Sequence, residues 1–313
     1  MVAHLFISNS DDMKRVFVLF VLFLSASFVA DRLLGLAFYK VFSSSDCTEN
    51  YVHRQCDADV VILGSSRAKH HYVPSIITDS LGLSCYNLGG NGKNIYYQYA
   101  NMQLLLTHHT PKIVIYDCFS VDVQKADFKY DFGSLSDLYP IYGRNNNVDT
   151  LIELQGMQYV SRIKCSHLFR YNSRFIEYLT SHQSGNNQGY EPLSGEYNKD
   201  LSIHYENENL VKDETKIAYM QKLIDICKDR NIQIVFSVSP RYALNEIDAP
   251  MTKKYECVST LCRENSVPFL YYELDNTFLS NGKLFRDVGH LNDKGARQFT
   301  KQFVGDLRKV VHN

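Results

Sequence analysis

Short apolar runs alternate with longer amphipathic stretches along most of the chain. Each apolar run has the length and β-branched content of a buried strand, and the stretches between them carry apolar residues at helical spacing. This alternation predicts βαβ units and a parallel sheet covered by helices on both faces, that is, a three-layer α/β/α sandwich. The predicted strands are 60–63, 84–88, 112–116, 232–238 and 267–272, and the predicted helices are 67–81, 95–108, 213–230, 249–265 and 293–311.

The alternation stops between about residues 119 and 210, in a stretch that is rich in Tyr, Asn, Ser and Gly. A structureless loop of this length would be unusual in a compact domain. Helical stretches at 150–160 and 173–180 instead indicate an inserted subdomain. Because the insert follows the third strand, we expect it beside the carboxyl edge of the sheet, where sites in such folds lie.

A different pattern precedes the alternation. The segment 16–30 contains no charge, the pair Asp31-Arg32 follows it, and the chain is then apolar again. A membrane span needs about 20 residues, so we expect the helix to continue to about Phe42, with Arg32 snorkelling to an interface. This pattern favours a transmembrane signal anchor at 16–42. The alternatives are a cleaved signal peptide, whose cleavage pattern is weak here, and a buried core helix.

The anchor divides the chain into parts. We expect residues 1–15 in the cytoplasm, a polar linker at 43–57 and a globular domain at 58–313. Because nearly all of the chain follows the span, the domain is expected to be extracytoplasmic, either periplasmic or at the cell surface. In such a compartment Cys47 and Cys56 could form a disulfide.

Composition narrows the possible partners. A net charge of −1 over 313 residues lacks the basic excess of a nucleic-acid binder. The eight cysteines include no C-x-x-C pair, and the adjacent histidines at 70–71 and 108–109 have no matching carboxylate cluster in the sequence. We therefore expect neither a nucleic-acid partner nor a metal or other cofactor.

Two short motifs carry candidate chemistry. Gly64-Ser65-Ser66 lies between the first strand and the first helix, where backbone N–H groups favour negative charge. A serine there suits a nucleophile whose attack creates an oxyanion, although serine is also an ordinary N-cap. Asp287-Val-Gly-His290 precedes the last helix and can orient an imidazole toward a serine proton, although it could also be a surface pair. Together, Ser66, His290 and Asp287 have the parts of a hydrolytic triad.

A glycine-rich turn, Asn87-Leu-Gly-Gly-Asn-Gly92, follows the second strand. Glycines there let backbone N–H groups approach a substrate closely, although turns between strands and helices are often glycine-rich. Asn91 in this turn is a candidate substrate contact. Arg67, next to the serine, could bind an anionic substrate group or pair with a neighbouring carboxylate, as arginine commonly does near a helix start.

The order of these motifs resembles that of the SGNH (GDSL-like) hydrolase superfamily over about residues 58–118 and 213–311. The strings Val-Ile-Leu-Gly-Ser-Ser-Arg, Tyr-Asn-Leu-Gly and His-Leu-Asn-Asp-Lys-Gly-Ala are similar to its membrane-anchored bacterial branch. That branch handles acyl groups of cell-envelope polymers, as in D-alanyl transfer to teichoic acids and alginate O-acetylation. The resemblance implies a five-stranded, flavodoxin-like sheet and a serine nucleophile.

The resemblance also implies roles for single residues. Ser66 corresponds to the nucleophile, Asp287 to the orienting acid and His290 to the base. The N–H groups of Ser66 and Gly92 correspond to oxyanion donors, with Gly90 as a less close match to the glycine.

The third oxyanion donor of typical members is missing here. They carry an asparagine after strand three, whereas this chain reads Tyr116-Asp-Cys-Phe-Ser-Val-Asp122. Loss of one such donor typically lowers turnover by about 10²–10³. Ser120 or the insert is the candidate replacement.

The resemblance therefore implies a serine esterase or O-acyltransferase that forms an acyl-enzyme. Its substrate would be an acylated envelope or secreted glycan, or a small acyl ester, and an envelope-assembly protein is a possible partner. The alternative is a catalytically weak or inactive envelope protein that binds a glycan or a partner, which the missing asparagine favours. A nucleotide binder is disfavoured because the chain lacks G-x-G-x-x-G and the P-loop lysine pattern.

Overall fold

Five parallel strands form the central sheet of the computed structural model, which describes residues 2–171, 174–180, 187–198, 211–242 and 255–311. The spatial order is β2-β1-β3-β4-β5, the order of doubly wound, flavodoxin-like sheets. The predicted α/β class and sheet are thus confirmed. The strands are β1 (Val60–Gly64), β2 (Cys85–Asn87), β3 (Ile113–Asp117), β4 (Gln233–Val238) and β5 (Phe269–Tyr271).

Alternate side chains of the strands enter two separate cores. Val60 and Ile62 of β1 pack in the core of one face, and Val61 and Leu63 pack in the core of the other. Burial on both faces explains why these strands are continuous apolar runs. The first face is covered by α3 (Ser66–His71), α4 (Pro74–Leu81) and α14 (Asp293–Val311), and the second by α5 (Ile95–Leu105), α10 (Glu214–Asp229) and α12 (Glu256–Glu264).

Some predicted helices have different bounds. The helix expected over 67–81 is broken because Pro74 disfavours helical conformation in the preceding residue, and Tyr72 and Val73 are extended. The helix expected over 249–265 is described as α12 from Glu256 onward, and residues 249–254 lie outside the described residues. Short elements α13 (Asn276–Leu279) and η5 (Gly282–Leu284) precede α14.

The insert contains more short elements than its sequence predicted. The helix expected over 150–160 is two helices, because Gly156 adopts a left-handed conformation with φ of 92° between them. The helix expected over 173–180 begins at Phe175 in the described residues. The elements are η1 (Ser120–Asp122), α6 (Phe128–Phe132), η2 (Gly133–Ile141), α7 (Asn146–Glu153), α8 (Met157–Cys165), η3 (Leu168–Arg170) and α9 (Phe175–Thr180).

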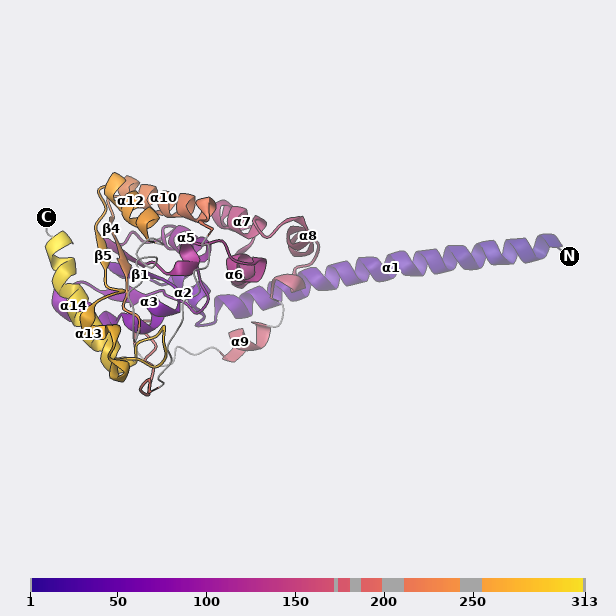
Figure 1. The fold of residues 1–313 in the computed structure, drawn as a ribbon. Helices are drawn as coiled ribbons and strands as arrows, with labels where there is room; N and C mark the ends of the chain where they lie inside the picture. Colours follow the sequence, from indigo (N-terminus) through magenta and orange to yellow (C-terminus); the bar gives the residue numbers. More distant parts are fainter. Residues whose placement is uncertain (1, 172–173, 181–186, 199–210, 243–254, 312–313) are drawn as a thin grey trace.

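The N-terminal helix α1 (Val2–Ser43) projects far from the domain (Figure 1). Its section Asp11–Ser43 is long and apolar enough to cross a membrane, and it is the one such helix in the described part of the chain. The last turns of α1 nevertheless belong to the domain, since Phe42 is fully buried in a core.

The expected linker at 43–57 is wrong, because this segment is folded. It contains α2 (Thr48–Arg54), which packs against α5. Glu49 is buried and accepts a hydrogen bond of 2.7 Å from the hydroxyl of Tyr97. The disulfide that Cys47 and Cys56 could form is not present, and both are buried free thiols.

Candidate active site

Ser66, His290 and Asp287 form one hydrogen-bonded series at the carboxyl edge of the sheet. The Oγ of Ser66 lies 2.8 Å from Nε2 of His290. On the opposite side of the ring, Nδ1 lies 2.9 Å and 3.1 Å from the two carboxylate oxygens of Asp287. The structure thus brings together three residues from positions more than 200 apart in the sequence, at distances suited to proton transfer.

The turn after β1 places Ser66 by close backbone packing. Gly64 has φ of +144°, and a Cβ there would lie 2.6 Å from the carbonyl oxygen of Asp117 on β3. Ser65 is the N-cap of α3 and accepts a hydrogen bond from the Arg67 N–H at 3.4 Å. Ser66 is therefore the first residue of the helix, where its own N–H has no partner within the helix.

The loop that carries His290 is fixed by Asp287. One Asp287 oxygen accepts hydrogen bonds from the backbone N–H groups of Gly289 and His290, each at 2.9 Å, besides its contact with the ring. Burial opposes ionisation of Asp287, but these donors outweigh it and lower the pKa of its carboxyl. The group is therefore a carboxylate at neutral pH, as an orienting acid must be. Asn292 then caps α14 through Gly295 N–H at 3.0 Å, which fixes the chain directly after His290.

The candidate oxyanion donors differ in availability. Gly92 has a left-handed φ of +68° in an exposed turn, which favours glycine at this position. Gly90 is excluded as a donor in this conformation because its N–H donates to the carbonyl oxygen of Gly64 at 3.2 Å. Ser120 opens η1 directly after β3, at the same edge of the sheet, and the described residues offer its hydroxyl no hydrogen-bond partner. The N–H groups of Ser66 and Gly92 thus remain the candidate backbone donors, and Ser120 stays a candidate third.

Arg67 does not face a substrate. Its side chain is 1% exposed and lies beneath the site, where Nε donates to Ser239 Oγ at 3.1 Å. One guanidinium nitrogen donates to the Pro240 carbonyl at 3.3 Å, and another lies 3.9 Å from the buried carboxylate of Glu273. Substrate binding by Arg67 is thus corrected in favour of the structural pairing.

A buried polar network below the triad was missed by the sequence patterns. Asp117, at the end of β3, accepts hydrogen bonds from the Tyr72 hydroxyl at 2.7 Å and from the Ser239 hydroxyl at 3.1 Å. Burial raises the pKa of Asp117, although Arg67 opposes this. No local motif marks the network, because its members come from the ends of two strands and one helix, far apart in the sequence.

His71 extends this network to the catalytic loop. Its Nδ1 lies 2.9 Å from Ser239 Oγ, and its Nε2 accepts a hydrogen bond from Leu291 N–H at 3.0 Å. Since Nε2 accepts, the ring is neutral and its proton is on Nδ1. Burial, and then the charge of Arg67, lower the pKa of His71 well below its ordinary value of 6.5.

This neutral imidazole predicts acid sensitivity. Below pH 6.5 the unfolded chain binds a proton at His71 that the folded chain excludes, so this contribution to stability is present above pH 6.5 and is lost as pH falls. The loss is expected to reach about 1.4 kcal/mol per pH unit. We expect the free energy of unfolding, measured with denaturant from pH 7 downward, to fall more steeply with pH in wild type than in His71→Gln. Equal pH dependence of the free energy of unfolding in the two proteins would contradict a neutral His71.

His70 connects the glycine-rich turn with the insert. Its Nδ1 donates to the Glu191 carbonyl at 2.7 Å, and its Nε2 lies 3.2 Å from Oδ1 of Asn91. The ring also packs edge-on against His290, with centroids 5.6 Å apart. Asn91 thus lies beside His70, at an exposed position where a substrate contact stays a prediction.

One segment of the insert, the strap (residues 187–198), lies against α3 and the start of α14. Its Glu191 N–H donates to the Lys69 carbonyl at 3.2 Å, and its carboxylate lies 2.6 Å from Lys69 Nζ. Further along, the Leu193 and Gly195 carbonyls accept hydrogen bonds of 2.8 Å from Asp293 N–H and the Asn292 side chain. The strap therefore joins α3 to the start of α14 across the edge of the site.

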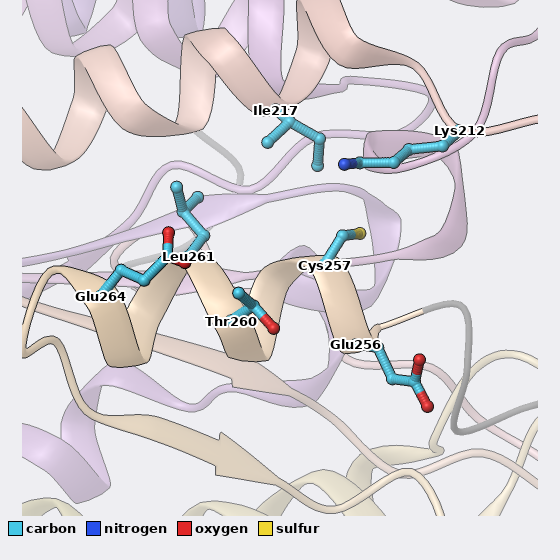
Figure 2. Close-up of a pocket in the computed structure, with 7 residues that line it drawn as sticks. All are labelled: Lys212, Ile217, Glu256, Cys257, Thr260, Leu261 and Glu264. Carbon is cyan, nitrogen blue, oxygen red and sulfur yellow. The ribbon is translucent and has the colours of Figure 1, made fainter.

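A separate hollow lies away from the triad, between α10 and α12 (Figure 2). It has a volume of about 320 Å³. Lys212 and Cys257 lie on one side of it, and the carboxylates of Glu256 and Glu264 lie along α12.

Comparison with known proteins gives distant similarity in fold. The sequence matches no family model and no curated protein. Among solved structures, it resembles an acetyl xylan esterase, AlAXEase, with 15% identity over 79% of this chain and 99% of that chain and a TM-score of 0.43. It also resembles an acetyl-xylooligosaccharide esterase from Geobacillus, with 10% identity over 79% of this chain and 93% of that chain and a TM-score of 0.41. A GDSL-like lipase from Bacteroides thetaiotaomicron is similar too, with 11% identity over 79% of this chain and 88% of that chain and a TM-score of 0.39. These values are too low to assign an activity.

Proposed function

We propose that this protein is a membrane-anchored serine esterase or O-acyltransferase that acts on a glycan carrying short acyl esters. The observation that carries the proposal is the series from Ser66 through His290 to Asp287, with separations of 2.8 Å and 2.9 Å. A serine that is hydrogen-bonded to an imidazole, itself oriented by a carboxylate, is the arrangement of an activated nucleophile.

In the first half of the reaction, Ser66 Oγ attacks the ester carbonyl carbon and its proton passes to Nε2 of His290. The N–H groups of Ser66 and Gly92 stabilise the negative charge that develops on the carbonyl oxygen. When the intermediate collapses, the ester bond breaks and His290 returns the proton to the departing sugar oxygen. The acyl group is then bound to Ser66.

In the second half, His290 takes a proton from water or from an acceptor hydroxyl, which attacks the acyl carbon. The bond between the acyl group and Ser66 then breaks, and His290 returns the proton to Ser66 Oγ. Water gives hydrolysis, and a sugar hydroxyl gives transfer. Asp287 stays ionised throughout and stabilises the imidazolium that forms in both halves. The chemistry at Ser66 is the same for esterase and transferase, so the acceptor alone distinguishes them.

The rim of the site supports a hydrated substrate. Asn91, Glu191 and Arg286 are exposed polar residues on the glycine-rich turn, the strap and the catalytic loop. Such a rim favours sugar hydroxyls over long acyl chains, because a long chain needs an apolar lining. The long apolar helix α1 supports a membrane anchor, with the site on the side where the chain continues.

The proposal is tested by acyl-chain selectivity. We expect the full-length protein in detergent to release acetate from acetylated xylo-oligosaccharides and to cleave 4-nitrophenyl acetate. Its kcat/KM for 4-nitrophenyl palmitate should be at least about tenfold lower than for the acetate, since a polar rim gains nothing from added methylenes. A preference for palmitate would contradict the proposed substrate, and absence of cleavage of every ester would favour the inactive, glycan-binding alternative.

A further inference from the structure

The helix that carries the candidate membrane span continues into the domain without a break. Apolar side chains are exposed along α1 from Val16 as far as Leu36, which is 62% exposed. They continue beyond the charged pair Asp31-Arg32, where a simple span would end. The apolar surface of α1 is therefore longer than its uncharged segment.

Helix geometry relates positions on α1 to bilayer depth. At about 1.5 Å per residue, a hydrocarbon core of about 30 Å that begins at Val16 extends to about Gly35. The polar headgroup layer adds about 5–7 Å, which is four or five residues more. The headgroup layer then lies at the level of about residues 36–39, and Asp31 lies about 6 Å below that layer, within the hydrocarbon.

The insert contacts α1 at these levels through η3 and α9, and α8 and α9 lie on opposite sides of α1 in the view of Figure 1. The Asp31 carboxylate accepts hydrogen bonds from the N–H groups of His167 and Leu168, at 2.8 Å and 3.1 Å, at the start of η3. Higher on α1, the ring of Phe38 stacks on Phe175 of α9 with centroids 3.9 Å apart. Phe38 thus fixes α9 at the height of the predicted headgroup layer, and Asp31 fixes the start of η3 just below it.

These elements carry the side chains that suit such a layer. Arg162 and Lys164 are exposed near the C-terminal end of α8. Ile176 and Leu179 are exposed on α9, 70% and 55% respectively, and their spacing of three places them on one face. Basic residues that reach phosphates, beside apolar residues that reach acyl chains, are typical of interfacial helices.

We infer that the surface formed by α8, η3 and α9, the membrane collar, is seated in the phospholipid headgroup layer around α1. The inference rests on the proposed anchoring by α1 and adds a second contact with the bilayer. It also accounts for Asp31. A carboxylate within the hydrocarbon is costly unless it is paired, and the collar supplies its hydrogen bonds.

The chain contains no tryptophan, so a single introduced tryptophan reports its own environment without background. Four full-length variants in nanodiscs test the collar by quenching with brominated phospholipids. Leu22→Trp reports the span, Cys165→Trp and Ile176→Trp report the collar, and Gln298→Trp on the exposed side of α14 reports the far end of the domain (Figure 1).

We expect lipid bromination to remove most of the fluorescence at Leu22→Trp and a substantial share at Cys165→Trp and Ile176→Trp, with no change at Gln298→Trp. The same variants in unbrominated nanodiscs are the reference. If Leu22→Trp is quenched while both collar positions behave like Gln298→Trp, the collar is overturned and the anchor stands. If Leu22→Trp is itself unquenched, the proposed membrane anchoring by α1 is contradicted, and the collar with it. Collar emission that is blue-shifted but unquenched would show that protein, not lipid, covers this surface, and would also overturn the inference.

Discussion

Ser66→Ala is expected to lower ester hydrolysis by about 10³- to 10⁶-fold, because only residual stabilisation by the oxyanion donors survives loss of the nucleophile. The structure places Ser66 Oγ 2.8 Å from His290, so no other hydroxyl of the turn replaces it in this contact. The measurement is the rate of 4-nitrophenyl acetate cleavage, together with covalent labelling by a fluorophosphonate probe. Both are expected to be lost in the variant while its unfolding transition is retained.

The adjacent serine provides the matched control. Ser65 differs from Ser66 by one position, and its hydroxyl contacts only a backbone N–H, at 3.4 Å, among the described residues. Ser65→Ala should keep probe labelling and lose about 0.5–2 kcal/mol of stability, as a capping residue does. Labelling that disappears with Ser65→Ala and persists with Ser66→Ala would reverse the assignment of the nucleophile.

Arg67→Met is expected to destabilise the fold by about 3–5 kcal/mol, since it removes the charge beside the buried Asp117 and leaves Glu273 with Arg241, whose Nε lies 3.6 Å away. The guanidinium lies 3.9 Å from the Glu273 carboxylate, and its charge also stabilises the ionised form of Asp117. The expected result is a much lower free energy of unfolding for the full-length protein in detergent micelles. The free energy of unfolding of Arg67→Lys should lie between those of wild type and Arg67→Met, because lysine keeps the charge and loses the planar guanidinium.

An exposed ion pair serves as the comparison for this effect. Lys112 lies 2.9 Å from Asp59, and its side chain is 63% exposed. Lys112→Met should therefore change the free energy of unfolding by no more than about 1 kcal/mol. Equal losses in Arg67→Met and Lys112→Met would show that the buried pairing contributes little.

The sheet was predictable from the sequence because its strands are buried on both faces. A run such as Val60–Leu63 is buried throughout and has no polar position to confuse with a helix face. The series of Ser66, Asp287 and His290 was predictable for a different reason. Each lies beside a glycine or a helix start, so the local pattern marks its place at the edge of the sheet.

Polar residues that find distant partners were not predictable. Glu49 and Asn50 look like linker residues, yet both are buried, because α5 supplies Tyr97 to the first and the end of α1 supplies carbonyl oxygens to the second. Arg67 looks like a surface residue beside a nucleophile, and its partner Glu273 follows about 200 residues later. Local composition carries no information about such pairs, so the sequence did not predict the burial of Glu49, Asn50 or Arg67.

The continuity of α1 limits the distance from the membrane at which Ser66 can act. Helix, collar and domain share hydrogen bonds and stacked rings at Asp31 and Phe38, so the described part of α1 offers no swivel between bilayer and domain. An anchored Ser66 would then stay at a fixed distance from the bilayer surface and could move only parallel to the membrane. Substrates would be selected by how far their acyl groups stand from the membrane as well as by their chemistry, and lengthening α1 by two turns, about 11 Å, would change which part of a tethered polymer is processed.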